Sequence, residues 1–205
     1  MRPKTWTYTP GAANSTGFLS NATLATFTLT TTTPGDGLAH KVVFDPDGTP
    51  DLSAITVDLT GTDADGRTQT ETITLTNGGG TTTSTKWYKT LVTAVPSATI
   101  GGETVDIGWS ADAVGPTIPV NWRGNPLELT LMCDISGTIN YDVEYTVQDV
   151  FASQPSTLTW TNHGTIVAKT ADTDSSTVVP IRAVRVAVNS VTAGATLSLT
   201  VIQGG

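Results

Sequence analysis

The chain has 205 residues, of which 42 are threonine and only 14% are charged; 18 acidic against 10 basic residues leave a formal net charge of -8. This balance argues against a nucleic-acid partner bound through phosphates, and the lack of an apolar run of about 18 residues argues against a transmembrane helix and a membrane partner. The helix formers Glu, Lys and Gln are sparse, so long solvated helices are not expected.

Residues 1–35 differ in composition from the rest of the chain. They are polar, rich in Ser, Thr and Ala, and contain four aromatic residues that include Trp6 and Tyr8. We expect an extended N-terminal arm that leads into a first strand around residues 25–30. The aromatic side chains could pack on their own domain or on a neighbouring subunit. We hypothesise that residues 1–20 extend onto a neighbour, because the stretch is too polar to form a core alone.

After the arm, apolar and polar residues alternate in several segments, which is the pattern of half-buried antiparallel strands. The predicted inward positions, in chain order, are Ile55, Val57, Leu59, Val105, Ile107, Trp109, Ile139, Tyr141, Val143, Tyr145, Val147, Val184, Val186, Val188, Leu197, Leu199 and Val201. Threonines lie mainly on the outward positions, where a β-branched hydroxyl side chain suits a pleated surface facing water. Turns separate these segments, and Asp65-Gly66 is typical of a hairpin.

Strands spaced roughly every 8 to 15 residues, with short turns and no helical periodicity, predict an all-β fold. A boundary near residues 111–118 divides the remainder into residues 36–115 and 116–205, each about the size of a small β-sandwich. We therefore expect two antiparallel β-sandwich domains, Ig-like or jelly-roll-like, that follow the arm of residues 1–35.

The chain shows no constellation typical of catalysis. Cys133 lies at one of the alternating apolar positions of its segment, which are predicted to face inward. It is therefore expected to be a small buried residue rather than a nucleophile. His40 and His163 are the only histidines, and no nucleophile elbow, zinc-ligand set or phosphate loop accompanies them. Asp142 and Glu144 share an outward strand face, whereas a glycosidase pair needs a cleft. We expect no enzymatic activity, no catalytic residue and no cofactor.

Two acidic segments leave a bound cation open as an alternative. Asp45, Asp47 and Asp51 lie in DPDGTPD, and Asp63 and Asp65 lie in DADG. Neither segment has the spacing of an EF-hand loop, and Asp and Gly are also the residues that tight turns require. Turn formation is the favoured interpretation and a calcium ion the alternative.

Five tryptophans are more than a chain of this length usually contains. Trp122, which precedes Arg123 in the loop-like PVNWRGNP, and Trp160 are the best candidates for an exposed contact. Together with Trp6 and Tyr8 of the arm, these are the predicted interface residues. The alternative interpretation is that the tryptophans are hydrophobic plugs at the ends of a sandwich.

Two parts of the chain resemble structural proteins of tailed-bacteriophage particles. Residues 57–96 and 105–110 are similar to a module that recurs in such proteins, through the TGTDADG hairpin, the ETI strand, the WYKTLV strand and a closing GW. Residues 139–205 are similar to short phage proteins through YTVQDVF, WTNH, PIRAVR and a terminal TVIQ. The resemblance consists of strands and turns and carries no catalytic residue.

This resemblance implies a non-enzymatic structural role in the virion, as a decoration or cement protein that stabilises the capsid. The implied partners are the major capsid protein or other virion proteins, together with further copies of the chain, as a trimer by analogy. A portal, adaptor or tail component is one alternative, and a glycan- or host-surface-binding module displayed on the virion is another. A single cysteine and no visible secretory signal fit assembly in a reducing host cytoplasm.

Overall fold

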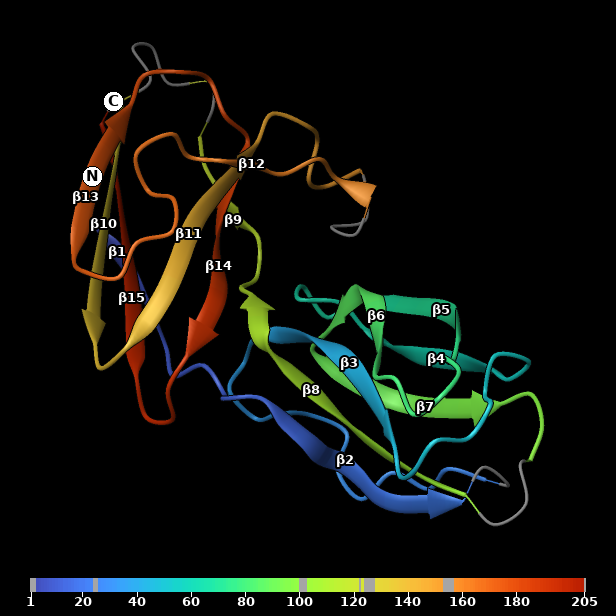
Figure 1. Cartoon of the computed structure of the whole chain (residues 1–205). Coiled ribbons are helices and arrows are strands. Elements are labelled where there is room, and N and C mark those ends of the chain that lie inside the picture. Colours follow the sequence, from blue (N-terminus) through green and yellow to red (C-terminus); the bar gives the residue numbers. More distant parts are fainter. Residues whose placement is uncertain are drawn as a thin grey trace. The chain divides into compact units, whose positions relative to one another are not determined.

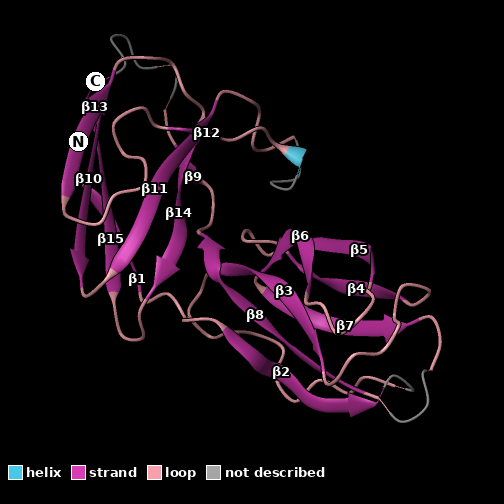
Figure 2. Cartoon of the chain, in the orientation of Figure 1, coloured by secondary structure: helices cyan, strands magenta, loops and turns pink. Residues whose placement is uncertain are grey.

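The computed structural model describes residues 3–23, 26–99, 103–121, 123, 128–152 and 157–204. The chain is all-β, with several antiparallel sheets, one of which curls into a half-barrel. Strands and the loops between them make up nearly all of the described chain (Figure 2). No helix within these ranges is long and apolar enough to cross a membrane.

The chain divides into two compact units. Unit 1 comprises Met1–Ala12, Asp36–Leu38 and Ala111–Gly205, and unit 2 comprises Ala13–Gly35 and Ala39–Ser110. Each unit has its own hydrophobic core. The last crossing of the chain from unit 2 to unit 1 follows Ser110, near the expected boundary at 115/116, but the first 38 residues are shared between the units.

Unit 1 contains two antiparallel sheets, which Figure 1 shows around a common interior. One sheet has the order β1-β15-β10-β13; the other has the order β12-β11-β14, with β9 and the last residues of β8 also paired to β14. The strands are β1 (Lys4–Tyr8), β9 (Ile118–Pro119), β10 (Glu128–Ser136), β11 (Ile139–Thr146), β12 (Thr161–Asn162), β13 (Thr173–Thr177), β14 (Ala183–Val191) and β15 (Thr196–Gly204).

Alternating side chains from both sheets form the core of unit 1. Leu131 and Leu199 from one sheet, and Val143 and Val186 from the other, are fully buried in the same cluster. Burial of such a side chain contributes about 1.5–3 kcal/mol relative to exposure. The predicted inward positions of these strands are confirmed except for Val147, which is 59% exposed because β11 ends at Thr146. The predicted outward positions of β11 and β14 are partly wrong, since Asp142, Thr146, Arg185 and Ala187 are also buried.

Unit 2 combines the sheet β5-β4-β7 with strands β2, β3, β6 and β8, in which β2 pairs with β8 and β3 pairs with β6. The strands are β2 (Asn14–Thr23), β3 (Ala39–Pro46), β4 (Thr56–Thr62), β5 (Thr68–Thr74), β6 (Thr82–Tyr88), β7 (Thr90–Pro96) and β8 (Thr104–Val114), whose last four residues belong to unit 1. The β4–β5 hairpin predicted at Asp65-Gly66 is confirmed, with Gly66 at a φ of 80°.

Strand β2 approaches β8 closely at two glycines. A Cβ on Gly108 would collide with the backbone of Asn14, and a Cβ on Gly17 would collide with the ring of Trp109. The space left by Gly17 lets the Trp109 ring pack edge-on against Phe18, with 5.1 Å between the ring centroids. Trp109, on β8, therefore packs against β2 and the core of unit 2, in agreement with its predicted inward position.

Residues 1–35 do not form the extended arm that the sequence suggested. Strand β1 pairs with β15, with Trp6 opposite Leu199, and β2 belongs to unit 2. Tyr8 is buried in the core of unit 1, and Trp6 packs against that core, so both pack on their own chain. The strand expected at residues 25–30 is not found, since the described part of this stretch is loop. A strand nearly 200 residues away supplies the apolar partner that the local sequence lacks.

Candidate functional site

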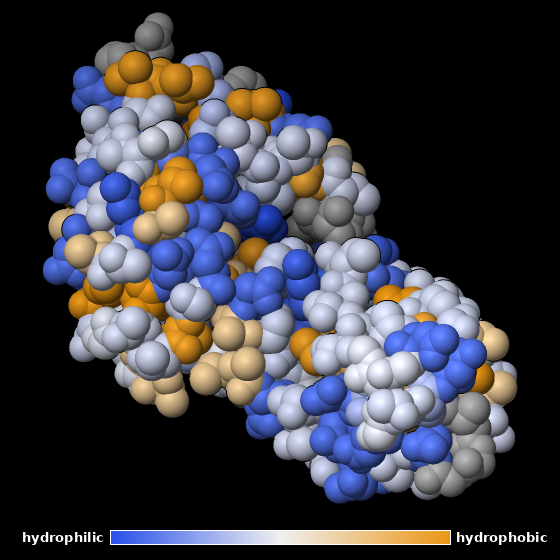
Figure 3. All heavy atoms as spheres, viewed as in Figure 1, coloured by the Kyte–Doolittle hydropathy of each residue, from blue (hydrophilic) through white to orange (hydrophobic). Residues whose placement is uncertain are grey.

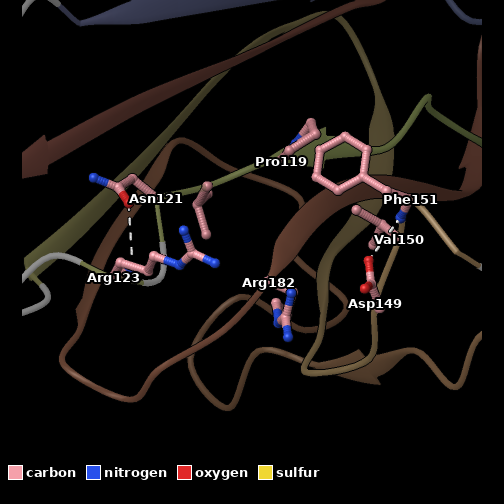
Figure 4. Close-up of a pocket in the computed structure, with 8 residues that line it drawn as sticks. Pro119, Asn121, Arg123, Asp149, Val150, Phe151 and Arg182 are labelled. Atoms are coloured by element: carbon pink, nitrogen blue, oxygen red, sulfur yellow. Dashed lines mark hydrogen bonds between the residues drawn. The ribbon is translucent and has the colours of Figure 1, made fainter.

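A cleft lies in unit 1 between the segment around β9, the start of β14 and the loop that follows β11. Its volume is about 410 Å³. Figure 4 shows the residues that line it, which are Pro119, Val120, Asn121, Arg123, Asp149, Val150, Phe151 and Arg182. The lining combines two arginines, one carboxylate, one amide and an aromatic ring.

Backbone and amide hydrogen bonds hold one wall of the cleft. Val120 donates its N–H to the carbonyl of Arg182 (3.0 Å), and Arg182 donates its own N–H to the carbonyl of Thr146 (2.8 Å). Asn121 donates its N–H to Oε1 of Gln203 (2.9 Å), and Nε2 of Gln203 donates to the carbonyl of Asn121 (2.5 Å). Because Gln203 is buried, this reciprocal pair is shielded from water. The backbone of this wall is therefore fixed at several points.

The opposite wall is a tight turn after β11. Oδ1 of Asp149 accepts the N–H of Phe151 (3.0 Å), as in an Asx turn. Val150 points inward and forms a small buried cluster with Leu158 and Ala183. Phe151 points outward and is 77% exposed. The turn is thus anchored by Val150 and presents a large aromatic ring to solvent.

The charge of the cleft is opposite to that of the chain. Arg123 and Arg182 supply two positive charges and Asp149 one negative charge, so the lining residues sum to +1 in a chain of net charge -8. The guanidinium group stays ionised and its planar fork suits a carboxylate or a phosphate. In Figure 4 the two guanidinium groups and the Asp149 carboxylate lie around one space, with the Phe151 ring above it. This arrangement can bind an anionic group beside an apolar one.

Trp160, predicted as an exposed contact, is instead half-buried against its own chain. The guanidinium carbon of Arg185 lies 4.3 Å from the centroid of the Trp160 ring, and Nε of Arg185 donates to Oε2 of Glu144 at 2.6 Å. The Trp160 side chain also packs against the cluster that contains Val150. The outer face of β11 and β14, expected to meet water, is therefore covered here by the loop after β11.

The other predicted interface residues are dispersed. Trp6 is half-buried, with Nζ of Lys4 4.8 Å from its ring centroid. Tyr8 is buried, and desolvation raises its pKa to about 12. Trp122 lies outside the described residues. Among the described members of this set, only Arg123 lines the cleft.

The nucleophilic and basic side chains considered above lie away from the cleft. Cys133 is fully buried, as predicted, and burial raises the pKa of its thiol to about 12. The thiol is therefore protonated at neutral pH and is a poor nucleophile. Nδ1 of His40 lies 2.8 Å from the carbonyl oxygen of Ser110, and desolvation lowers the pKa of the buried His163.

The carboxylates of the acidic segments accept hydrogen bonds from other groups of the protein. Asp47 accepts a hydrogen bond from the Thr104 hydroxyl (2.5 Å), and Asp51 accepts one from the Ser53 hydroxyl (2.7 Å). Oδ1 of Asp63 accepts the N–H groups of two residues in its own hairpin, each at 2.9 Å. Across the part of the chain that the structure describes, no group of three or more His, Cys, Asp or Glu side chains is placed to hold a metal ion. The contacts of Asp51 and Asp63 are those of turns, whereas the contact of Asp47 joins its turn to β8.

The outer face of the sheet β5-β4-β7 in unit 2 is an array of threonines. Three come from β4, four from β5 and two from β7: Thr56, Thr60, Thr62, Thr68, Thr70, Thr72, Thr74, Thr90 and Thr93. The register places Thr60 between Thr70 and Thr93 across the three strands. Neighbouring strands are about 4.8 Å apart, so hydroxyls can pair, as those of Thr62 and Thr90 do at 2.7 Å. We call this set the threonine array.

The outer face of the sheet β1-β15-β10-β13 in unit 1 is also rich in hydroxyls. The hydroxyl oxygens of Thr5 and Thr200 are 2.7 Å apart, and those of Thr7 and Ser198 are 2.8 Å apart. In Figure 3, pale and blue residues cover much of the visible surface of both units, and orange residues are confined to small patches. Each unit thus presents a sheet face of paired hydroxyl groups.

Of the lining residues, Arg123 was predicted from the sequence, whereas the other seven, which include Asp149, Phe151 and Arg182, were not. These three lie in QDVF and PIR, within segments that carry the resemblance to phage proteins. The feature that could have indicated this site in the sequence is the large aromatic residue Phe151, which comes two positions after the turn-forming Asp149. No protein-family model matches this chain, and a search of the curated proteins finds no match.

Proposed function

We propose that this chain is a non-enzymatic structural protein of a bacteriophage particle, and that it decorates the capsid and stabilises the head. The threonine array of unit 2 is the observation that carries the proposal, because it offers an extended, weakly charged surface for contact with another protein. The resemblance of residues 57–96, 105–110 and 139–205 to phage structural proteins supports the same role.

The chemistry of threonine suits a contact of this kind. Each side chain offers a methyl group for apolar packing and a hydroxyl that can donate and accept hydrogen bonds. The array itself carries no charge, and Asp58, on β4, is the charged residue of the three strands that shares its face, so little charge would have to be desolvated. The β-branched side chains are also restricted in rotamer, so they lose little entropy when an interface forms.

Each unit acts, in this proposal, as a β-sandwich module that keeps its outer sheet face rigid. The two sheets of unit 1 share one core, and residues of the sheet β5-β4-β7 share a core with residues of β3 and β8 in unit 2. The protein binds the major capsid protein as a homo-oligomer, as a trimer if it occupies threefold positions of the shell.

Cosedimentation with purified expanded heads of the phage that encodes the chain tests this function. We expect the wild-type protein to pellet with the heads. The double variant Thr70→Arg/Thr93→Arg places two charges at opposite ends of one row of the array and should weaken binding at least about tenfold. Thr28→Arg changes an exposed loop residue of the same unit and should bind like the wild type.

Full binding of the double variant would contradict the role of the threonine array. A wild-type protein that neither binds heads nor copurifies with virions would contradict a role on the capsid. Recovery with isolated tails or portal vertices, rather than with head shells, would favour the portal, adaptor or tail alternative. Thermal melting of each variant separates loss of binding from loss of folding.

A further inference from the structure

We propose that the cleft of unit 1 binds an acidic peptide segment of a partner protein, in which a carboxylate side chain is next to an aromatic or large apolar one. The carboxylate contacts Arg123 and Arg182, and the apolar side chain packs on Phe151. This site lies in unit 1, and the inference does not depend on attachment to a capsid through the threonine array of unit 2.

The charge of the lining residues selects an anionic ligand. Two of the ten basic residues of the chain line this one cleft, and among its described lining residues Asp149 alone is acidic. Charge-assisted hydrogen bonds from arginine to a carboxylate are short and about twice as strong as neutral ones. Because Oδ1 of Asp149 already accepts the N–H of Phe151, this carboxylate also serves to shape the turn.

The apolar part of the lining selects the second half of the ligand. Phe151 is 77% exposed, whereas Val120 and Val150, on either side of the cleft, are buried. In Figure 4 the ring of Phe151 lies beside Pro119. An aromatic or aliphatic side chain seated against this ring removes apolar surface from water, at about 25 cal/mol for each Å² buried. An isolated inorganic anion cannot make that contact.

The backbone of the cleft is organised before any ligand binds. Val120 and Arg182 are joined by a backbone hydrogen bond, and Asn121 is tied to Gln203 by two more hydrogen bonds. The turn on the other side is anchored by Val150. A fixed backbone lowers the entropic cost of binding, because fewer groups must be ordered when the ligand enters.

Size and charge favour a peptide over a polyanion. A volume of about 410 Å³ accommodates a pair of side chains. A nucleic acid would meet a chain of net charge -8 with only two arginines at the site. A short acidic segment presents one or two charges and an adjacent apolar group, which matches the composition of the lining.

Isothermal titration of the full-length protein with acetyl-Gly-Glu-Phe-Glu-Gly-amide tests this inference. We expect saturable binding that weakens as salt is added, since the ion pairs are partly exposed. Arg182→Gln and Arg123→Gln should each weaken binding about tenfold, and Phe151→Ala should weaken it severalfold. Lys169→Gln, which removes a basic side chain of unit 1 outside the cleft, should leave binding unchanged.

Two comparison ligands make the outcome decisive. The peptide in which both Glu residues are replaced by Gln should bind at least about tenfold more weakly, and inorganic phosphate should not displace the acidic peptide at equal concentration. Equal binding of the Gln peptide, displacement by phosphate alone, or no saturable binding would each overturn the proposal. Thermal melting of each variant shows whether it is folded.

Discussion

The guanidinium group of Arg185 lies against the ring of Trp160, with 4.3 Å between the guanidinium carbon and the ring centroid. The same group forms a 2.6 Å ion pair with Glu144. Arg185 is only 8% exposed, so the charge is removed from water and satisfied by the ring and the carboxylate together. This stack holds the end of the loop whose beginning carries Phe151, and so supports one wall of the cleft.

Trp160→Ala should lower the free energy of unfolding by about 2 kcal/mol, because it removes the cation–π contact and the buried area of the ring. Urea unfolding followed by circular dichroism measures this change. Trp160→Phe, which keeps a smaller ring over Arg185, should lose less than half as much stability. If both variants unfold at the wild-type midpoint, the stack contributes nothing to stability.

Gly108→Ala should destabilise the protein by about 2 kcal/mol or more, since the added methyl group would overlap the backbone of Asn14 where β2 crosses β8. Gly164→Ala is the matched control, because a Cβ at Gly164 meets no atom within 4 Å. Thermal melting of the two variants distinguishes them. Equal melting temperatures would show that β2 does not pack against β8 as described.

The buried Asp63 should make stability depend on pH. Its side chain is 3% exposed, and desolvation raises its pKa above the ordinary value, although N–H groups of Arg67 and Asp65 oppose the shift. Because the folded pKa exceeds the unfolded one, the folded state binds this proton more tightly. The contribution of Asp63 to stability is therefore lost as the pH rises from the unfolded pKa of about 3.9 through the folded pKa.

Asp63→Asn keeps an oxygen that accepts the two N–H groups and removes the charge. We expect this variant to be more stable than the wild type near pH 7, with the difference shrinking towards about pH 3, below the unfolded pKa. Urea midpoints at both pH values measure the effect. Asp174→Asn, on an exposed position of β13, is the control. A pH-independent difference for Asp63→Asn would rule out titration of this carboxyl as its cause.

Cys133 should be unreactive in the native state. Burial raises the pKa of the thiol to about 12 and removes it from solvent. The native protein should react with a disulfide reagent such as dithionitrobenzoate at least about 100-fold more slowly than the protein in concentrated guanidinium chloride, where the thiol is exposed and its pKa is ordinary. Similar rates in the two states would show that Cys133 is accessible in the fold.

The local alternation of apolar and polar residues was sufficient to predict the core strands, but it could not predict the cleft. Alternation predicted the burial of Val57, Leu59 and Leu197 because each strand exposes every second residue to the same environment. Phe151 and Arg182 are separated by 31 positions in the chain, and no periodicity relates them. Both line the cleft because β14 pairs with β11, which places Arg182, directly before β14, beside the turn that follows β11.

The sequence by itself determined that the chain is all-β, that Cys133 is buried and that Asp65-Gly66 forms a hairpin. These features depend on the alternation of apolar and polar residues and on turn-forming residues, both of which act between residues close in the chain. Only the tertiary structure decided that Trp6 lies opposite Leu199 and that Trp160 stacks on Arg185. Those contacts join segments that local propensity does not relate, and they form because a side chain's burial depends on which distant strand or loop covers it.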